Sequence, residues 1–137
     1  MTEIQALLLI KSILESADIH GIENILAEDC EYMSTGRGII GRNRNETIEF
    51  LSSMAESIKA DNVPVTCKVM HIADVYEEDA LFREDRHGLT VSYESGDNYV
   101  YMIFVDVNDE GLVDRIVSSQ ENYSIDYDDL RFGADES

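Results

Sequence analysis

Basic residues, proline, tryptophan and cysteine are all scarce in this sequence of 137 residues, and the shortage of basic residues excludes the most. Ten lysines and arginines stand against 29 aspartates and glutamates, which gives a formal net charge of −19. A field of that sign repels phosphate groups, so we expect no nucleic acid and no anionic membrane surface among the partners. Cations and basic proteins would be attracted, although high acidity also serves solubility alone.

Long apolar runs are missing as well. The longest candidate, residues 6–10, ends at Lys11, whereas a membrane-spanning helix needs roughly 18–20 apolar residues. The basic flank and the small-residue cleavage site of a secretory signal do not accompany it. We therefore expect a cytoplasmic protein without a membrane segment.

The two cysteines, Cys30 and Cys67, are too few and too far apart for a metal motif or a disulfide framework. Both lie in apolar strand patterns, which predicts buried free thiols. The three histidines lack metal-ligand spacing, and the acidic residues 74–79 lack the glycine and the ligand order of a calcium loop. We expect neither a metal nor another cofactor.

Helical patterns occupy the first half of the chain, and 44% of all residues are hydrophobic. Thr2 and Gln5 fit a capping box at the start of a first helix with a wide apolar face. Asp18 is placed to cap a second, shorter helix. Asn43 or Asn45 caps a third helix.

From residue 65 onward the periodicity is that of strands, as it is in the short segment 30–34. Three helices followed by a largely antiparallel sheet predict one α+β domain over residues 1–123, and residues 124–137 are predicted to form an acidic C-terminal tail. The later strands are expected at residues 65–72, 80–84, 89–93, 99–107 and 112–123, with a turn at 85–88 and a hairpin loop at 108–111.

Three segments, in this order, resemble the nuclear transport factor 2-like superfamily, which includes ketosteroid isomerases and SnoaL-like polyketide cyclases. Residues 18–29, DIHGIENILAED, resemble its second helix and acidic junction. Gly41-Arg42 with residues 46–51 is similar to its approach to the third helix, and residues 105–120, VDVNDEGLVDRIVSSQ, resemble its closing hairpin. The resemblance implies a cone-shaped curved sheet packed against three N-terminal helices, with a pocket at the open end and a homodimer through the outer sheet face.

Strand alternation suggests which polar side chains face such a pocket. His71 with Glu84 or Glu121 could carry out proton transfer, while a tyrosine hydroxyl stabilises a developing oxyanion. The superfamily's isomerases place an aspartate on the concave face, whereas Asp106 and Asp114 point outward by parity. A lone histidine on a sheet face is more often structural, and tyrosines there are often amphipathic core residues. The candidate ligand-binding residues are Tyr32, Tyr99, Tyr101, Arg115, Arg37 and Arg42.

Arg37, Arg42 and Arg44 form the one basic cluster of the sequence. They lie beside the start of the third helix, where a positive charge is unfavourable by roughly 0.3–1 kcal/mol. They could bind a carboxylate or phosphate of a ligand. The alternative is structural pairing with nearby acids: Glu28, Glu31 or Glu46.

These patterns favour a SnoaL-like domain that binds a small organic molecule between helices and sheet, and they leave catalysis open. The alternative is an acidic protein-interaction module, of the immunity or regulator type, that binds a basic protein. Ionic strength distinguishes the two, because salt weakens binding between charged surfaces and barely changes uptake into an apolar pocket.

Overall fold

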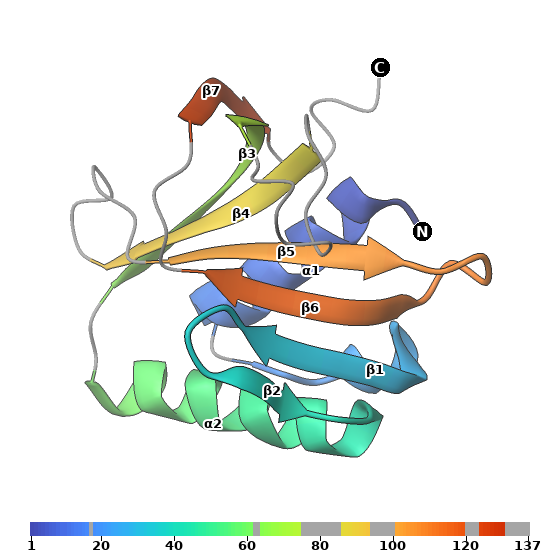
Figure 1. Ribbon diagram of the computed structural model, residues 1–137. Helices are drawn as coiled ribbons and strands as arrows, with labels where there is room; N and C mark the ends of the chain where they lie inside the picture. The colour runs from blue at the N-terminus through green and yellow to red at the C-terminus, as the bar shows by residue number, and fades with distance from the viewer. Residues whose placement is uncertain (17, 62–63, 75–85, 94–100, 120–123, 131–137) are drawn as a thin grey trace.

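The structure, a computed structural model, describes residues 1–16, 18–61, 64–74, 86–93, 101–119 and 124–130 (Figure 1). In these residues two α-helices and one 3₁₀ turn pack with a seven-stranded sheet in the order β2-β1-β6-β5-β4-β3-β7. The helical elements are α1 (Glu3–Ser16), η1 (Ile22–Asn24) and α2 (Arg44–Asp61). The strands are β1 (Leu26–Ser34), β2 (Gly38–Gly41), β3 (Val65–Asp74), β4 (Arg86–Tyr93), β5 (Tyr101–Val107), β6 (Val113–Ser119) and β7 (Ser124–Leu130).

The sheet is curved and mostly antiparallel, which confirms the predicted α+β class. Only β1 and β6 run parallel among the described neighbours. An extra residue, Asp114, lies in β6 opposite the step from Asp106 to Val107 in β5. A bulge of this kind bends a strand and increases its twist. Figure 1 shows α1 and α2 on the same side of the curved sheet.

The first and third predicted helices are present with their predicted caps. The Thr2 amide donates to the Gln5 side chain (2.9 Å), and the Gln5 amide donates to the Thr2 hydroxyl (3.1 Å). At α2 the Asn43 side chain accepts the amide of Glu46 (2.9 Å). Neither described helix has the length and apolar character that crossing a membrane requires.

The predicted second helix is wrong. It is reduced to the single turn η1, because Gly21 adopts a φ of 86° immediately before it, a left-handed conformation that ends a right-handed helix. The chain then enters β1 at Leu26, four residues earlier than the predicted strand at Cys30.

Part of the predicted acidic tail belongs to the sheet. Residues Ser124–Leu130 form β7, which pairs antiparallel with β3. Acidic residues hide the strand pattern there, and charged residues are common on edge strands because they oppose aggregation. Strand β4 also starts at Arg86, inside the turn predicted at 85–88. The strand predicted at 80–84 lies outside the described residues.

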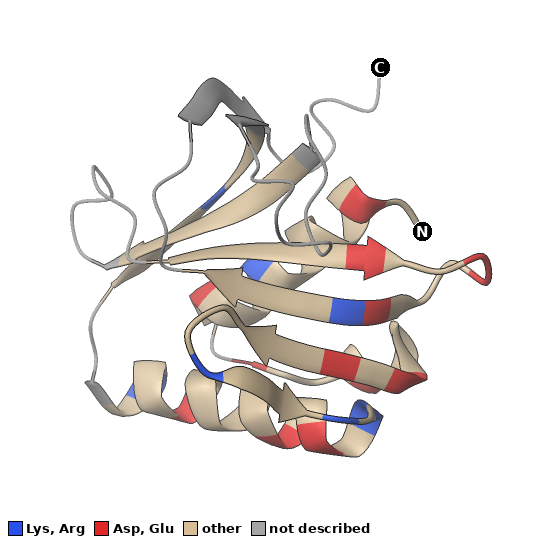
Figure 2. Cartoon of the chain, in the orientation of Figure 1, with Lys and Arg blue, Asp and Glu red and all other residues tan. Residues whose placement is uncertain are grey.

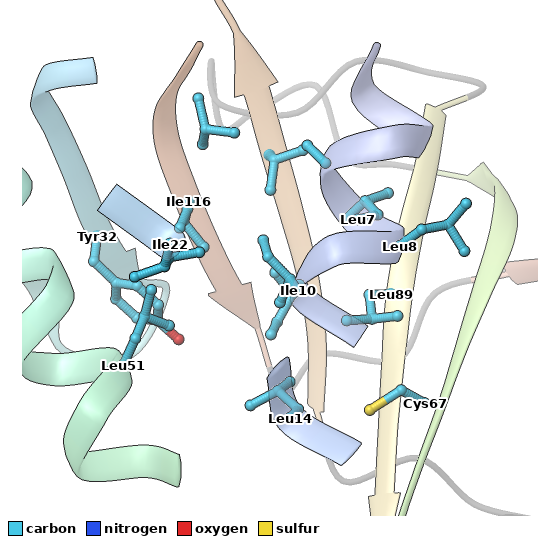
Figure 3. Close-up of a cluster of buried hydrophobic side chains, with 14 of the residues drawn as sticks. Leu7, Leu8, Ile10, Leu14, Ile22, Tyr32, Leu51, Cys67, Leu89 and Ile116 are labelled. Carbon is cyan, nitrogen blue, oxygen red and sulfur yellow. The ribbon is translucent and has the colours of Figure 1, made fainter. Parts of the chain in front are cut away.

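The core lies between the helices and the concave face of the sheet (Figure 3). Leu7, Ile10 and Leu14 of α1 are at most 1% exposed. Cys30 and Cys67 are buried free thiols, as predicted. Fully buried side chains of the concave face include Tyr32, Val69, Leu89, Val91, Ile103, Val113 and Ile116.

Two side chains of α1 also bind the edge of β3. The Lys11 ammonium donates to the carbonyl of Cys67 (2.6 Å), and the Glu15 carboxylate accepts the Cys67 amide (3.2 Å). Strand β7 pairs with β3 only from Val69 onward. The two side chains therefore satisfy backbone groups that no described strand pairs with, and they hold α1 across the sheet.

A close contact joins β1, β2 and α2. The buried Thr47 hydroxyl donates to the carbonyl of Cys30 (2.9 Å). Gly41, the last residue of β2, lies so near that a Cβ atom there would be 2.9 Å from both the amide nitrogen and the hydroxyl of Thr47. Glycine is the one residue that allows this approach of helix and strand.

We predict that Gly41→Ala lowers the free energy of unfolding by about 1–3 kcal/mol, because the backbone of Thr47 must move to admit the methyl group. Gly36→Ala is the matched control, since its Cβ would meet no atom within 4 Å, and its effect should stay within about 0.5 kcal/mol. Urea unfolding measures both. Equal losses in the two variants would contradict the close contact.

Candidate functional site

At one end of the concave face the side chains change from fully buried to half-buried. This is the end at which β1 and β6 finish and β3 and β5 begin, on the left in Figure 1. The β-ladders align it across the sheet, because Ser34 pairs with Ser118 and Tyr101 pairs with Val91. We call this end the mouth and define it by six half-buried residues: Ser34, Met54, Ile58, Val65, Tyr101 and Ser118.

Tyr32 lies directly below the mouth and is 1% exposed. Its ring packs on that of Phe50 with the centroids 4.5 Å apart, and its hydroxyl lies 3.9 Å from the sulfur of Met54. Burial raises the pKa of Tyr32 to about 12, against the opposing effect of a hydrogen bond with Ser118. The side chain is thus a neutral phenol that can donate a hydrogen bond.

Tyr101 comes to the same end as Tyr32. It begins β5, its ring is half-buried, and its hydroxyl oxygen is buried. Ile103, two residues further along the same face, pairs with Ser118. The ladders place Tyr32 four residues further along the face than Tyr101, but its hydroxyl contacts the mouth residues Met54 and Ser118. Two predicted ligand-binding tyrosines are thus associated with the mouth, together with two serines that the sequence analysis did not single out.

His71 lies at the opposite end of the concave face from the mouth. It pairs with His87, and the two ring centroids are 5.4 Å apart. Val91 is the partner of Tyr101 in the ladder. His87 lies four residues before Val91 along β4, and four residues of a strand span roughly 13 Å. The predicted combination of His71 with a mouth tyrosine is therefore not assembled. The other predicted members, Glu84, Glu121 and Tyr99, lie outside the described residues.

Arg115 does not face the core, so its predicted place on the concave face is wrong. It lies between Glu31 and Asp106 in the ladders, on the outer face, and its guanidinium is 3.7 Å from the Glu31 carboxylate. The extra residue Asp114 reverses the alternation of β6 at this point. A bulge leaves no clear mark in the sequence, which also explains why Ser118 was missed.

Arg37 and Arg42 are exposed and Arg44 is half-buried. The structure does not show the alternative of pairing with nearby acids. In the described part of the chain, no ion pair joins these three arginines to a carboxylate. Glu31 is paired with Arg115, and the Glu46 carboxylate accepts the backbone amide of Arg42 (3.0 Å).

The described strands place hydroxyls, thiols and imidazoles on the concave face, and the ladder pairs Asp126 of β7 with His71 at the end away from the mouth. Burial, as the largest cause, raises the pKa of each cysteine thiol to about 12, so neither is a ready nucleophile. Within the described ranges no three histidine, cysteine or acidic side chains are grouped to hold a metal ion. The polar groups of the mouth residues Ser34, Tyr101 and Ser118 are hydroxyls, which suit hydrogen bonding to an uncharged molecule better than acid–base catalysis.

The sequence matches no family model and no curated protein, but the fold resembles many solved structures. An NTF2-like protein of unknown function from Mesorhizobium loti superposes with a TM-score of 0.58 and 14% identity, over 89% of this chain and 96% of that one. An LEH-like epoxide hydrolase from M. tuberculosis gives 0.55 and 18%, over 87% and 82%. A proposed isomerase of the SnoaL-like family from Agrobacterium tumefaciens gives 0.52 and 14%, over 86% and 99%.

These similarities identify a class of protein. The chain has the nuclear transport factor 2-like fold, which confirms the resemblance read from the sequence. Identities of this size establish the fold alone, since proteins of one fold differ widely in activity.

Because the two thiols are buried, we expect the free energy of unfolding to depend on pH in the alkaline range. Below their ordinary pKa of 9.0 the thiols are protonated in the folded and the unfolded chain. As the pH rises from about 9 toward 12, the unfolded thiols ionise first, so the free energy of unfolding falls by up to about 1.4 kcal/mol per pH unit for each thiol.

Urea unfolding between about pH 7.5 and 10, in the presence of a reductant, measures this slope. Cys67→Ala lowers the stability at every pH because it leaves a cavity, but its slope above pH 9 should be shallower than that of the original protein. Identical slopes would show that Cys67 titrates normally in the folded chain.

Proposed function

We propose that the protein binds a small, neutral organic molecule between α1, α2 and the sheet, as a SnoaL-like binding domain. The observation that carries this proposal is the mouth itself. Apolar side chains there, Met54, Ile58 and Val65, are only half-buried, and the hydroxyl-bearing residues Tyr101 and Ser118 belong to the same end. Small-molecule sites combine an apolar wall with a few polar groups in this way.

The charge of the protein supports a neutral ligand. A net charge of −19 opposes the approach of anions to the mouth, because none of the six mouth residues is a lysine or arginine. None of the six residues of the mouth carries a carboxylate that would pair with a cation, whereas Tyr101 and the underlying Tyr32 carry phenol groups. A carbonyl, ether or hydroxyl oxygen is the natural partner for such donors.

Catalysis is not part of this proposal. The proposed catalytic set combined His71 with Glu84 or Glu121, and His71 is half-buried at the end away from the mouth. We expect His71→Ala to leave ligand binding unchanged.

A neutral dye that fluoresces in apolar surroundings, Nile red, tests the proposal. Ile58→Glu places a charge in the mouth and should weaken dye binding by about tenfold or more, since burying an unpaired carboxylate is costly. Ile39→Glu is the matched control, because Ile39 pairs with Met33 on the outer side of β2 and is 40% exposed. Its dye affinity should stay that of the original protein.

Dye binding should also be insensitive to salt. Equal affinities for the original protein and Ile58→Glu would mean that the dye binds elsewhere, and no binding at all would count against a ligand pocket.

The alternative function, binding of a basic protein partner, would use the end of the sheet away from the mouth. Carboxylates gather there across β1, β6 and β5 (Figure 2). Burial and the neighbouring Asp106 and Asp29 carboxylates raise the pKa of Asp114, although Arg115 opposes them. A basic partner would relieve this repulsion, and its binding would weaken steeply with salt.

A further inference from the structure

Strand β2 is one edge of the described sheet, and no described strand pairs with its free edge. In the described sheet β2 pairs with β1 alone. Gly38 and Ile39 are exposed, and Ile39 is one of two large hydrophobic residues exposed in the described chain; the other is Met1. An edge strand of this kind offers backbone donors and acceptors to another extended chain.

Arginines flank this edge strand at both ends. Arg37 precedes the strand and Arg42 follows it, five residues apart, which corresponds to roughly 17 Å in an extended chain. Arg44 is the first residue of α2, where the helix dipole disfavours a cation. None of the three is paired with a described carboxylate, in a chain whose net charge is −19. Their positions serve no internal ion pair in the described chain.

We propose that the outer edge of β2 is a docking site for an extended, acidic segment of a partner protein. The segment would add a strand to the sheet through main-chain hydrogen bonds, and its acids would pair with Arg37 and Arg42. Acids spaced five residues apart match the two arginines in either strand direction. This site is separate from the mouth and does not depend on the proposed ligand.

The positive charges of Arg37 and Arg42 favour an acidic segment over a second copy of the chain as the occupant of this edge. Two antiparallel copies of β2 would bring Arg37 of one beside Arg42 of the other, and like charges placed opposite each other are destabilising. The irregular register between β1 and β2 also shortens the regular edge, and bulged, short edges resist self-pairing. An acidic partner removes the repulsion and needs only a short strand.

The test uses a fluorescein-labelled peptide, Glu-Val-Thr-Val-Thr-Glu, and measures anisotropy with the full chain at low ionic strength. Arg42→Glu should weaken binding by about tenfold or more, and so should Ile39→Glu. Lys59→Glu is the matched charge reversal, at an exposed position in the last turn of α2, and should change affinity by less than about twofold. Circular dichroism checks that each variant is folded.

Two control peptides separate main-chain pairing from simple attraction. Methylating alternate backbone nitrogens removes donors and should weaken binding by about tenfold, whereas replacing both glutamates by lysines should abolish it. The amide NMR signals of Gly38, Ile39 and Ile40 should shift on binding.

Three results would overturn the proposal. The first is equal binding of the methylated peptide, and the second is equal binding by Arg42→Glu. The third is absence of binding at millimolar peptide. Sedimentation showing a dimer that Ile39→Glu dissociates would assign the edge to a second copy instead. Nile red binding is expected to survive in Arg42→Glu, so failure of this site and failure of the ligand proposal give different results.

Discussion

The packing of two helices against one face of a curved sheet is the interaction on which the other features depend. Leu7, Ile10 and Leu14 of α1 are buried on strands β3 to β5, and α2 packs on the β1–β2 hairpin. Burial of a large aliphatic side chain stabilises the fold by about 1.5–3 kcal/mol. At the mouth the described side chains are only half-buried, so that end is where we propose that a neutral molecule reaches the concave face.

Polar contacts determine where the helices lie on the sheet, whereas apolar burial supplies most of the free energy that holds them there. Lys11 and Glu15 hold α1 at the edge of β3 through the backbone of Cys67. Thr47 holds α2 at β1 through the carbonyl of Cys30, and Gly41 allows the close approach. Each contact satisfies a buried or edge backbone group that would otherwise be costly. Together they fix the position of each helix on the sheet.

Local signals in the sequence predicted much of this fold. The capping box at Thr2, the cap at Asn43 or Asn45 and the strand patterns of β3 and β5 are short-range signals, and the structure has the capping box, the Asn43 cap and both strands. What failed depends on long-range pairing or on a single backbone conformation. Gly21 shortened a predicted helix, and acidic residues concealed β7. The extra residue Asp114 places Arg115 on the outer face and Ser118 on the concave face, so one of the six mouth residues was not predictable from parity.

The central claim is that a neutral ligand enters at the mouth rather than at the histidine end or on the outer face. Intermolecular nuclear Overhauser effects between bound Nile red and the methyl groups of the protein test this directly. The account predicts contacts to Met54, Ile58 and Val65. Contacts to Val107 and Val113, near the other end of β5 and β6, or to the outer-face residue Met33, would contradict it.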